Sequence, residues 1–279
     1  MVTATVGESM AKWARGEASV GALIMIGSRV RTPTGPLAAD GHSDWDFQVI
    51  TSTPGAFSRR EWVHQLGLGG SVIYASRTGR LGSATKVTVV LEVGELDLVV
   101  IPERRLRLAK YLVYLGLGRR MDVVKRSLTD LALVLRSGYQ ILKGEPAWGP
   151  FLKTVVSDFP PLRMSNREIC AEAEAYVCDW LSTRHKIERG EFLAAQRWLH
   201  HQLAETNFRL LHELRQRREQ LTLPDARRLE SLMESPALVT VCAVPTRDSL
   251  LAATEKSAVT LRELMQSLVG DAWRWPLTG

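Results

Sequence analysis

The sequence has 279 residues, of which 45% are hydrophobic and 24% are charged. This length is enough for two domains that each bury a core, and the composition is ordinary for a water-soluble globular protein. No apolar run approaches the ~20 residues that a membrane-spanning helix needs, and the first residues do not read as a signal peptide. The three cysteines, Cys170, Cys178 and Cys242, lack metal-ligand spacing, so we expect a reduced, cytoplasmic setting rather than a disulfide scaffold.

The net charge of +6 is placed unevenly along the chain. Residues 1–145 contain 19 Lys and Arg against 13 Asp and Glu, whereas residues 146–279 contain 17 of each kind. A polyanionic partner, such as nucleotide phosphates or nucleic acid, would account for a basic first half. A basic surface that keeps the protein soluble would account for it equally well, and composition does not separate the two.

The first half alternates short apolar runs of strand type with helical stretches. The strand-type runs, each bounded by Gly, Ser or Pro, are 21–27, 45–51, 71–76, 86–92 and 95–101. Only Val93 and Gly94 separate the last two runs, which predicts a tight antiparallel hairpin. Helical stretches are expected near 6–18, 57–66, 103–116 and 122–136. This mixture predicts a mixed sheet packed against helices.

From about Trp148 onward the pattern becomes that of long helices. Ser165 precedes Glu168 by three residues, the spacing of a capping box, and so predicts the start of a helix. Apolar residues recur at helical spacing through 165–190, and further helices are expected within 191–219, 224–234 and 246–268. We place the linker in the turn-rich segment 143–150. The expected organisation is therefore α+β, with a mixed-sheet domain at 1–145 followed by a helical bundle domain at 146–279.

Carboxylates accompany two of the predicted strands. Asp44 and Asp46 share one face because side chains alternate along a strand, and Asp97 shares a face with Glu95 in the later run. If the two strands are neighbours, Asp44, Asp46 and Asp97 converge. Like charges at that distance need compensation, and Mg²⁺, which prefers a few carboxylates plus phosphate oxygens, would supply it. Solvated aspartates at strand ends are the alternative.

A Gly-Ser pair closes the first predicted strand. Gly27 would let the backbone approach a phosphate closely, and Ser28 would add a hydroxyl donor. Together with the carboxylates, the pair favours metal-assisted phosphoryl or nucleotidyl transfer. Each signal taken alone is weak, since Gly-Ser is also a common loop dipeptide; their order along the chain carries the hypothesis.

The motifs "GS…SDWDF" and "ELDLVVI" resemble those of the nucleotidyltransferase superfamily. Within it, the chain is most similar to the streptomycin-type aminoglycoside adenylyltransferases, on the segment "MIGSRVRTP…SDWDFQVI" and the later helical half. The resemblance implies a nucleotidyltransferase catalytic domain at 1–145 and an acceptor-binding domain at 146–279. It also implies residue roles: Mg²⁺ held by Asp44 and Asp46, ATP phosphates contacted by Gly27, Ser28 and Arg29, and Asp97 as a further metal ligand or the base.

The helical half offers further candidates. Glu168, Glu172 and Asp179 fall within about 40° of one another on a helix, so they would suit a cationic acceptor or form a solvated flank. In the segment "HKIERGE", Lys186 or Arg189 would reach a triphosphate and Glu191 would act as a general base, unless the segment is only a charged helix junction. Glu95 is a further candidate for holding the acceptor.

The resulting hypothesis is an enzyme that uses Mg²⁺ to transfer AMP from ATP to a hydroxyl of a small, cationic acceptor such as an aminoglycoside, releasing pyrophosphate. Two alternatives stay open: a protein acceptor, as in toxin-like members of the superfamily, and a non-catalytic nucleotide-sensing module. We expect a monomer or weak dimer, with no nucleic-acid partner and no membrane partner.

Overall fold

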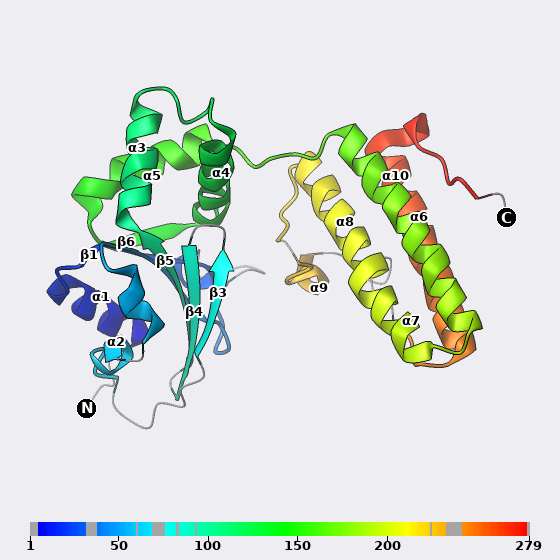
Figure 1. The fold of residues 1–279 in the computed structure, drawn as a ribbon, viewed down its shortest axis with the longest axis horizontal. Coiled ribbons are helices and arrows are strands. Elements are labelled where there is room, and N and C mark those ends of the chain that lie inside the picture. Colours follow the sequence, from blue (N-terminus) through cyan, green and yellow to red (C-terminus); the bar gives the residue numbers. More distant parts are fainter. Residues whose placement is uncertain are drawn as a thin grey trace. The chain divides into compact units, whose positions relative to one another are not determined.

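The computed structural model describes residues 5–31, 38–59, 61–68, 76–81, 84–92, 94–223, 225–232 and 242–277. The chain divides into two compact units, Met1–Leu162 and Arg163–Gly279 (Figure 1). In this described part of the chain, no helix combines the length and the apolar character needed to cross a membrane.

A mixed sheet forms the centre of the first unit. Its described strands are β1 (Val20–Ile26), β2 (Trp45–Thr51), β3 (Ser76–Leu81), β4 (Ala84–Leu91), β5 (Gly94–Pro102) and β6 (Tyr139–Lys143). They lie in the order β3-β4-β5-β2-β1-β6, with β2 and β5 parallel and the other neighbours antiparallel. Together with the helical second unit, this confirms the predicted α+β class.

The strand predictions hold wherever they fall on described residues. The run 45–51 is β2, the run 21–27 is β1 displaced by one residue, and the predicted hairpin is the antiparallel pair β4 and β5. Of the run 71–76, only Ser76 is described, as the first residue of β3; the rest lies outside the described residues. β6 is a strand beyond the five predicted runs.

Helices cover both faces of the sheet (Figure 1). On one face, α1 (Val6–Gly16), the short turn η2 (Pro54–Ser58) and α2 (Glu61–His64) enclose an apolar core that includes Leu23, Phe47 and Leu98. On the other face, α3 (Glu103–Tyr114), α4 (Asp122–Arg136) and α5 (Glu145–Asp158) pack around Ile24 and Ile50. The predicted helix 122–136 matches α4 at both ends.

The predicted linker at 143–150 is wrong. Gly144 takes a left-handed conformation, with φ of 87°, after β6, and α5 begins at the next residue with a proline in its first turn. A proline is tolerated there because the first helical N–H groups have no partner within the helix. Trp148 and Phe151 are buried in the core shared with α4, so the segment belongs to the first unit. The boundary lies after Leu162 instead of after Glu145.

The second unit is helical, as predicted. Its described elements are α6 (Asn166–Glu188), α7 (Phe192–Trp198), the π-helical turn η3 (Leu199–Ala204), α8 (Glu205–Arg217), α9 (Leu229–Leu232), α10 (Arg247–Val269) and the short turn η5 (Gly270–Ala272). Among the buried side chains, Tyr176 Oη donates to Ser257 Oγ at 2.7 Å, and Asn207 Nδ2 donates to the same hydroxyl at 3.1 Å. Burial raises the pKa of Tyr176, which keeps this network uncharged.

Candidate functional site

The strand register places two of the predicted carboxylates side by side. Asp46 on β2 is directly paired with Asp97 on the parallel strand β5, and Ile26 at the end of β1 lies opposite Asp46. Register partners in neighbouring strands point to the same face of a sheet. The prediction that the two strands are neighbours, with Asp46 and Asp97 on one face, is therefore confirmed.

Gly27 meets Asp46 at the end of β1. Its φ of 82° is a conformation that favours glycine, and a Cβ at this position would run into the carboxylate oxygen Oδ2 of Asp46. Ser28 then opens the 3₁₀ turn η1 (Ser28–Val30). The Gly-Ser pair and the Asp46–Asp97 pair thus occupy one end of the sheet.

Arg29 fixes the segment that leads into β2. Its Nε donates to the backbone oxygen of Asp44 at 3.2 Å, its guanidinium also donates to the backbone oxygen of Ser43, and it lies 4.2 Å from the centre of the Trp45 ring. Trp45 in turn stacks on Phe47, on the sheet face opposite Asp46. In this structure the Arg29 guanidinium contacts two backbone oxygens and the Trp45 ring. Its predicted contact with ATP phosphates stays a prediction.

Both oxygens of Asp97 have partners on the neighbouring strand β4. Lys86 Nζ lies 2.5 Å from Oδ2, and Thr88 Oγ1 donates to Oδ1 at 2.5 Å. Thr88 is the register partner of Asp97, and Lys86 lies two residues earlier on the same face. Neither residue was predicted from the sequence. The alternation in "TKVTVVL" and the short hairpin turn would have identified them, because a hairpin with a fixed turn fixes which residues are opposite.

Asp44 does not join the other two aspartates in a cluster. Among the described residues, no three Asp, Glu, His or Cys side chains gather closely enough to hold a metal ion. The predicted convergence of Asp44, Asp46 and Asp97 is therefore not formed. Asp44 lies just before β2, in the segment whose backbone accepts hydrogen bonds from Arg29. The position of its side chain is therefore set by the loop conformation and not by the register of the sheet.

The remaining donor set nevertheless fits a hard divalent cation. Mg²⁺ is often bound through one or two carboxylates plus substrate phosphates, and Asp46 with Asp97 would supply such a pair. Gln48 follows Asp46 on the same face of β2 and is buried; no described residue donates to its side-chain oxygen. Glu95 lies on the Asp97 face as well, paired with Val90 on β4.

The predicted acceptor-binding residues of the helical unit have partners inside that unit. Glu168 Oε2 accepts from the backbone N–H and the hydroxyl of Ser165, both at 2.7 Å, which confirms the capping box. These bonds lower the pKa of Glu168. Glu172 forms an ion pair with Arg209 at 2.6 Å, whereas Asp179 is partly buried and desolvation raises its pKa. All three lie on α6, and their predicted role toward a cationic acceptor stays a prediction.

The segment "HKIERGE" shows a similar pattern. Lys186 Nζ lies 4.6 Å from the centre of the Trp198 ring, and Glu191 forms an ion pair with Arg189 at 2.8 Å. A hydrogen bond from Arg189 lowers the pKa of Glu191. These contacts match the charged helix junction, and the predicted roles toward triphosphate and acceptor stay predictions.

Comparison with known proteins gives distant structural likenesses. No protein-family model matches the sequence, and no curated protein does. An aminoglycoside 6-adenyltransferase from Bacillus subtilis is similar in structure at 12% identity, with a TM-score of 0.40 over 98% of this chain and 94% of the other. A nucleotidyltransferase-like protein from Exiguobacterium sibiricum is similar at 12% identity, with a TM-score of 0.36 over 94% of this chain and 77% of the other. Likenesses at this level define neither a family nor an activity.

Proposed function

We propose that the protein is a nucleotidyltransferase that transfers AMP from ATP to a hydroxyl of a small acceptor. One observation carries the proposal: the register pair Asp46–Asp97 lies beside the glycine turn at Gly27 and Ser28. Nucleotidyl transfer needs a carboxylate-held cation and close backbone approach to phosphates at the same place. The elements of this site come from three strands of one rigid sheet.

In the proposed reaction, the acceptor oxygen forms a bond to the α-phosphorus of ATP while the bond to the pyrophosphate oxygen breaks. The acceptor hydroxyl gives its proton to solvent water, and pyrophosphate leaves. Asp46 and Asp97 would hold Mg²⁺, which supplies charge neutralisation at the phosphates. Gly27 and Ser28 would bind those phosphates through backbone N–H groups and a hydroxyl.

We assign Asp97 to metal binding rather than to proton abstraction. Its two oxygens already accept from Lys86 and Thr88, so the side chain is oriented by two strands of the sheet. A ligand that is fixed in this way holds a cation in a defined position. Lys86 is accordingly a positioning residue, and it adds positive charge where the triphosphate would lie.

We further propose that the acceptor is cationic, with Glu95 as its first contact. Of the predicted acceptor-binding acids, Glu95 shares the sheet face of Asp97, whereas Glu168 and Glu172 have partners within the helical unit. A carboxylate two residues from the metal pair would orient an ammonium group by charge-assisted hydrogen bonding.

The test is adenylyl transfer by the purified chain. The protein is incubated with Mg²⁺, ATP labelled on the α-phosphate and a panel of aminoglycosides, and pyrophosphate release and labelled products are measured. We expect one labelled small molecule, no transfer by Asp46→Asn, and full transfer by the control Asp130→Asn, an exposed aspartate on α4. Label on protein instead would assign a protein acceptor. ATP binding without any transfer would leave a nucleotide-binding module, and absence of ATP binding would overturn the proposal.

A further inference from the structure

The surface of α3 and of the connection to α4 combines exposed apolar side chains with a high positive charge. Seven large apolar side chains are exposed there: Leu108, Tyr111, Tyr114, Leu115, Leu117, Met121 and Val123. The same stretch, residues 103–126, contains eight Lys and Arg against two acids, a net charge of +6 that equals the net charge of the whole chain. We call this the α3 surface. Large exposed apolar patches mark interaction sites.

The helix geometry interleaves the two kinds of side chain. At 100° per residue, Arg104, Leu108 and Tyr111 fall within an arc of about 60° on α3, and Leu115 follows as the C-cap residue. Leu106 is the one buried residue of this helix, so most of α3 does not serve the core. Beyond the helix, Leu115 and Leu117 are followed by Arg119 and Arg120, of which Arg119 pairs with Asp158 at 2.9 Å.

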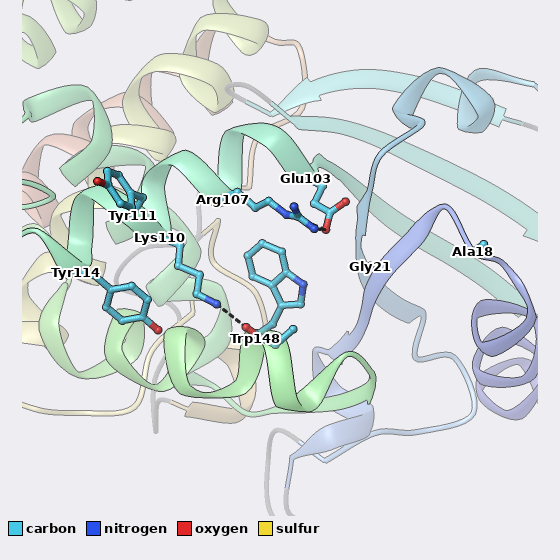
Figure 2. A pocket seen from close by; sticks show the side chains of 9 residues that line it. Ala18, Gly21, Glu103, Arg107, Lys110, Tyr111, Tyr114 and Trp148 are labelled. Carbon is cyan, nitrogen blue, oxygen red and sulfur yellow. Dashed lines mark hydrogen bonds and ion pairs between the residues drawn. The ribbon is translucent and has the colours of Figure 1, made fainter.

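A concavity of about 630 Å³ lies beside this stripe, between α3 and the first turn of α5 (Figure 2). Lys110 Nζ donates to the backbone oxygen of Ala147 at 2.6 Å and lies 5.8 Å and 5.3 Å from the ring centres of Tyr114 and Trp148. Arg107 lines the same concavity and pairs with Glu103 at 2.9 Å. The concavity thus places cations and aromatic rings beside the apolar stripe.

We propose that the α3 surface binds a membrane that contains anionic lipids. Basic residues would meet lipid phosphates, with Lys110 and Arg107 placed to receive a headgroup, while Leu108 and Leu115 would enter the acyl boundary. Long cationic side chains can bury their stems in apolar surroundings and keep their charge at the interface. This interaction departs from the expectation of no membrane partner and is independent of the proposed catalytic activity.

Other occupants fit the surface less well. Single-stranded nucleic acid is held by stacking on aromatic rings, and five of the seven exposed apolar side chains are aliphatic or Met. Protein–protein interfaces are depleted of lysine, whereas Lys110 lies in the concavity beside the apolar stripe. A lipid interface accommodates both features.

The test is sedimentation of the full chain with vesicles of phosphatidylcholine alone and of equal parts phosphatidylcholine and phosphatidylglycerol. We expect binding to the anionic vesicles only. Replacing two cations, Arg104→Glu with Arg120→Glu, should weaken binding at least about tenfold, because each Lys or Arg beside an anionic surface contributes ~1 kcal/mol. The matched control changes two exposed arginines of the helical unit, Arg218→Glu with Arg227→Glu, and should bind as the parent does.

The apolar part is tested in the same assay. Leu108→Asp with Leu115→Asp should abolish binding, whereas the change Leu193→Asp, at a still more exposed leucine of the helical unit, should not. Absence of binding to anionic vesicles, or equal loss in test and control variants, would overturn the proposal. The proposal would also be overturned if the main effect of the leucine variants were the loss of a complex with a labelled oligonucleotide. Loss of a dimer, measured by size-exclusion chromatography, as their main effect would overturn it as well.

Discussion

At the scale of single residues, the geometry of the candidate site is set by a few contacts of Gly27 and Asp97. Gly27 is the clearest case, because its backbone conformation and its distance to Asp46 both require the absence of a side chain. Asp97 is the second case, since β4 supplies a partner for each of its oxygens. For each residue, a substitution can be tested for its effect on stability or metal binding separately from its effect on ATP binding or turnover.

The first prediction concerns Gly27→Ala. The new Cβ meets the Asp46 carboxylate, and the alanine must adopt a positive φ. We therefore expect a loss of about 1–3 kcal/mol in the free energy of unfolding and weaker ATP binding. Gly41→Ala is the control, because a Cβ there meets nothing within 4 Å. Urea denaturation and an ATP titration of each variant measure the two effects. Parent-like ATP binding by Gly27→Ala would show that the nucleotide binds elsewhere.

The second prediction concerns Lys86→Met, which keeps the length of the side chain and removes its charge. Asp97 then lacks its cation, so we expect Mn²⁺ to bind more tightly while turnover falls by about tenfold or more, since hydrogen bonds to charged groups are worth ~1.5–3 kcal/mol. Electron paramagnetic resonance counts bound Mn²⁺ without requiring activity. Lys153→Met, an exposed lysine on α5, should change neither quantity. Unchanged metal affinity in Lys86→Met would remove the positioning role.

At the scale of elements, local sequence patterns explain most of what was predictable. Alternation along 45–51 and helical spacing along 122–136 are local signals, and β2 and α4 follow them to the residue. The segment 143–150 was wrongly predicted as a linker because Gly and Pro residues are typical of turns. In the structure the glycine ends β6 and the proline opens α5, and burial of Trp148 stabilises a helix that local propensity does not predict.

The third prediction concerns the start of α6. Ser165→Ala removes the cap that donates to and accepts from Glu168, and loss of an N-cap destabilises a protein by about 0.5–2 kcal/mol. Ser182→Ala, in the same helix and away from its ends, should cost little because alanine has the highest helix propensity. Urea denaturation of both variants at neutral pH measures the difference.

The pH dependence of this cap has a defined sign. The bonds from Ser165 hold the pKa of Glu168 below its usual value of 4.5, so the folded state favours the carboxylate. The associated stability is present above the unfolded pKa and is lost as the pH falls through the folded pKa. The difference between the parent and Ser165→Ala should therefore shrink on acidification. A difference that stays constant from neutral to acid pH would contradict the role of the Glu168 charge.

At the scale of the whole molecule, the sequence predicted two units but not the full site. The carboxylate pair could be predicted because both aspartates belong to strands. Lys86 and Thr88 could also have been predicted, because the short turn between β4 and β5 fixes which residues lie opposite Asp97. The position of Asp44 depends on a loop, where neither alternation nor helical spacing applies.

The last prediction concerns the independence of the two units. Each unit has its own buried core: Leu261 is fully buried among α6, α8 and α10, and Leu98 is fully buried in the sheet. A Leu→Ala change in a core costs 2–5 kcal/mol, through lost burial and a cavity. If each core stabilises its own unit, Leu261→Ala should speed amide hydrogen exchange within Arg163–Gly279 and leave Met1–Leu162 unchanged.

Leu98→Ala is the matched change and should give the opposite pattern, with faster exchange in Met1–Leu162 and also weaker ATP binding, because β5 carries Asp97. Peptide-resolved mass spectrometry measures both variants in the same experiment. Exchange that accelerates throughout the chain in either variant would show that the units unfold as one cooperative body. The carboxylate site would then depend on the helical core, so that a change far from Asp46 and Asp97 would lower ATP binding through stability alone.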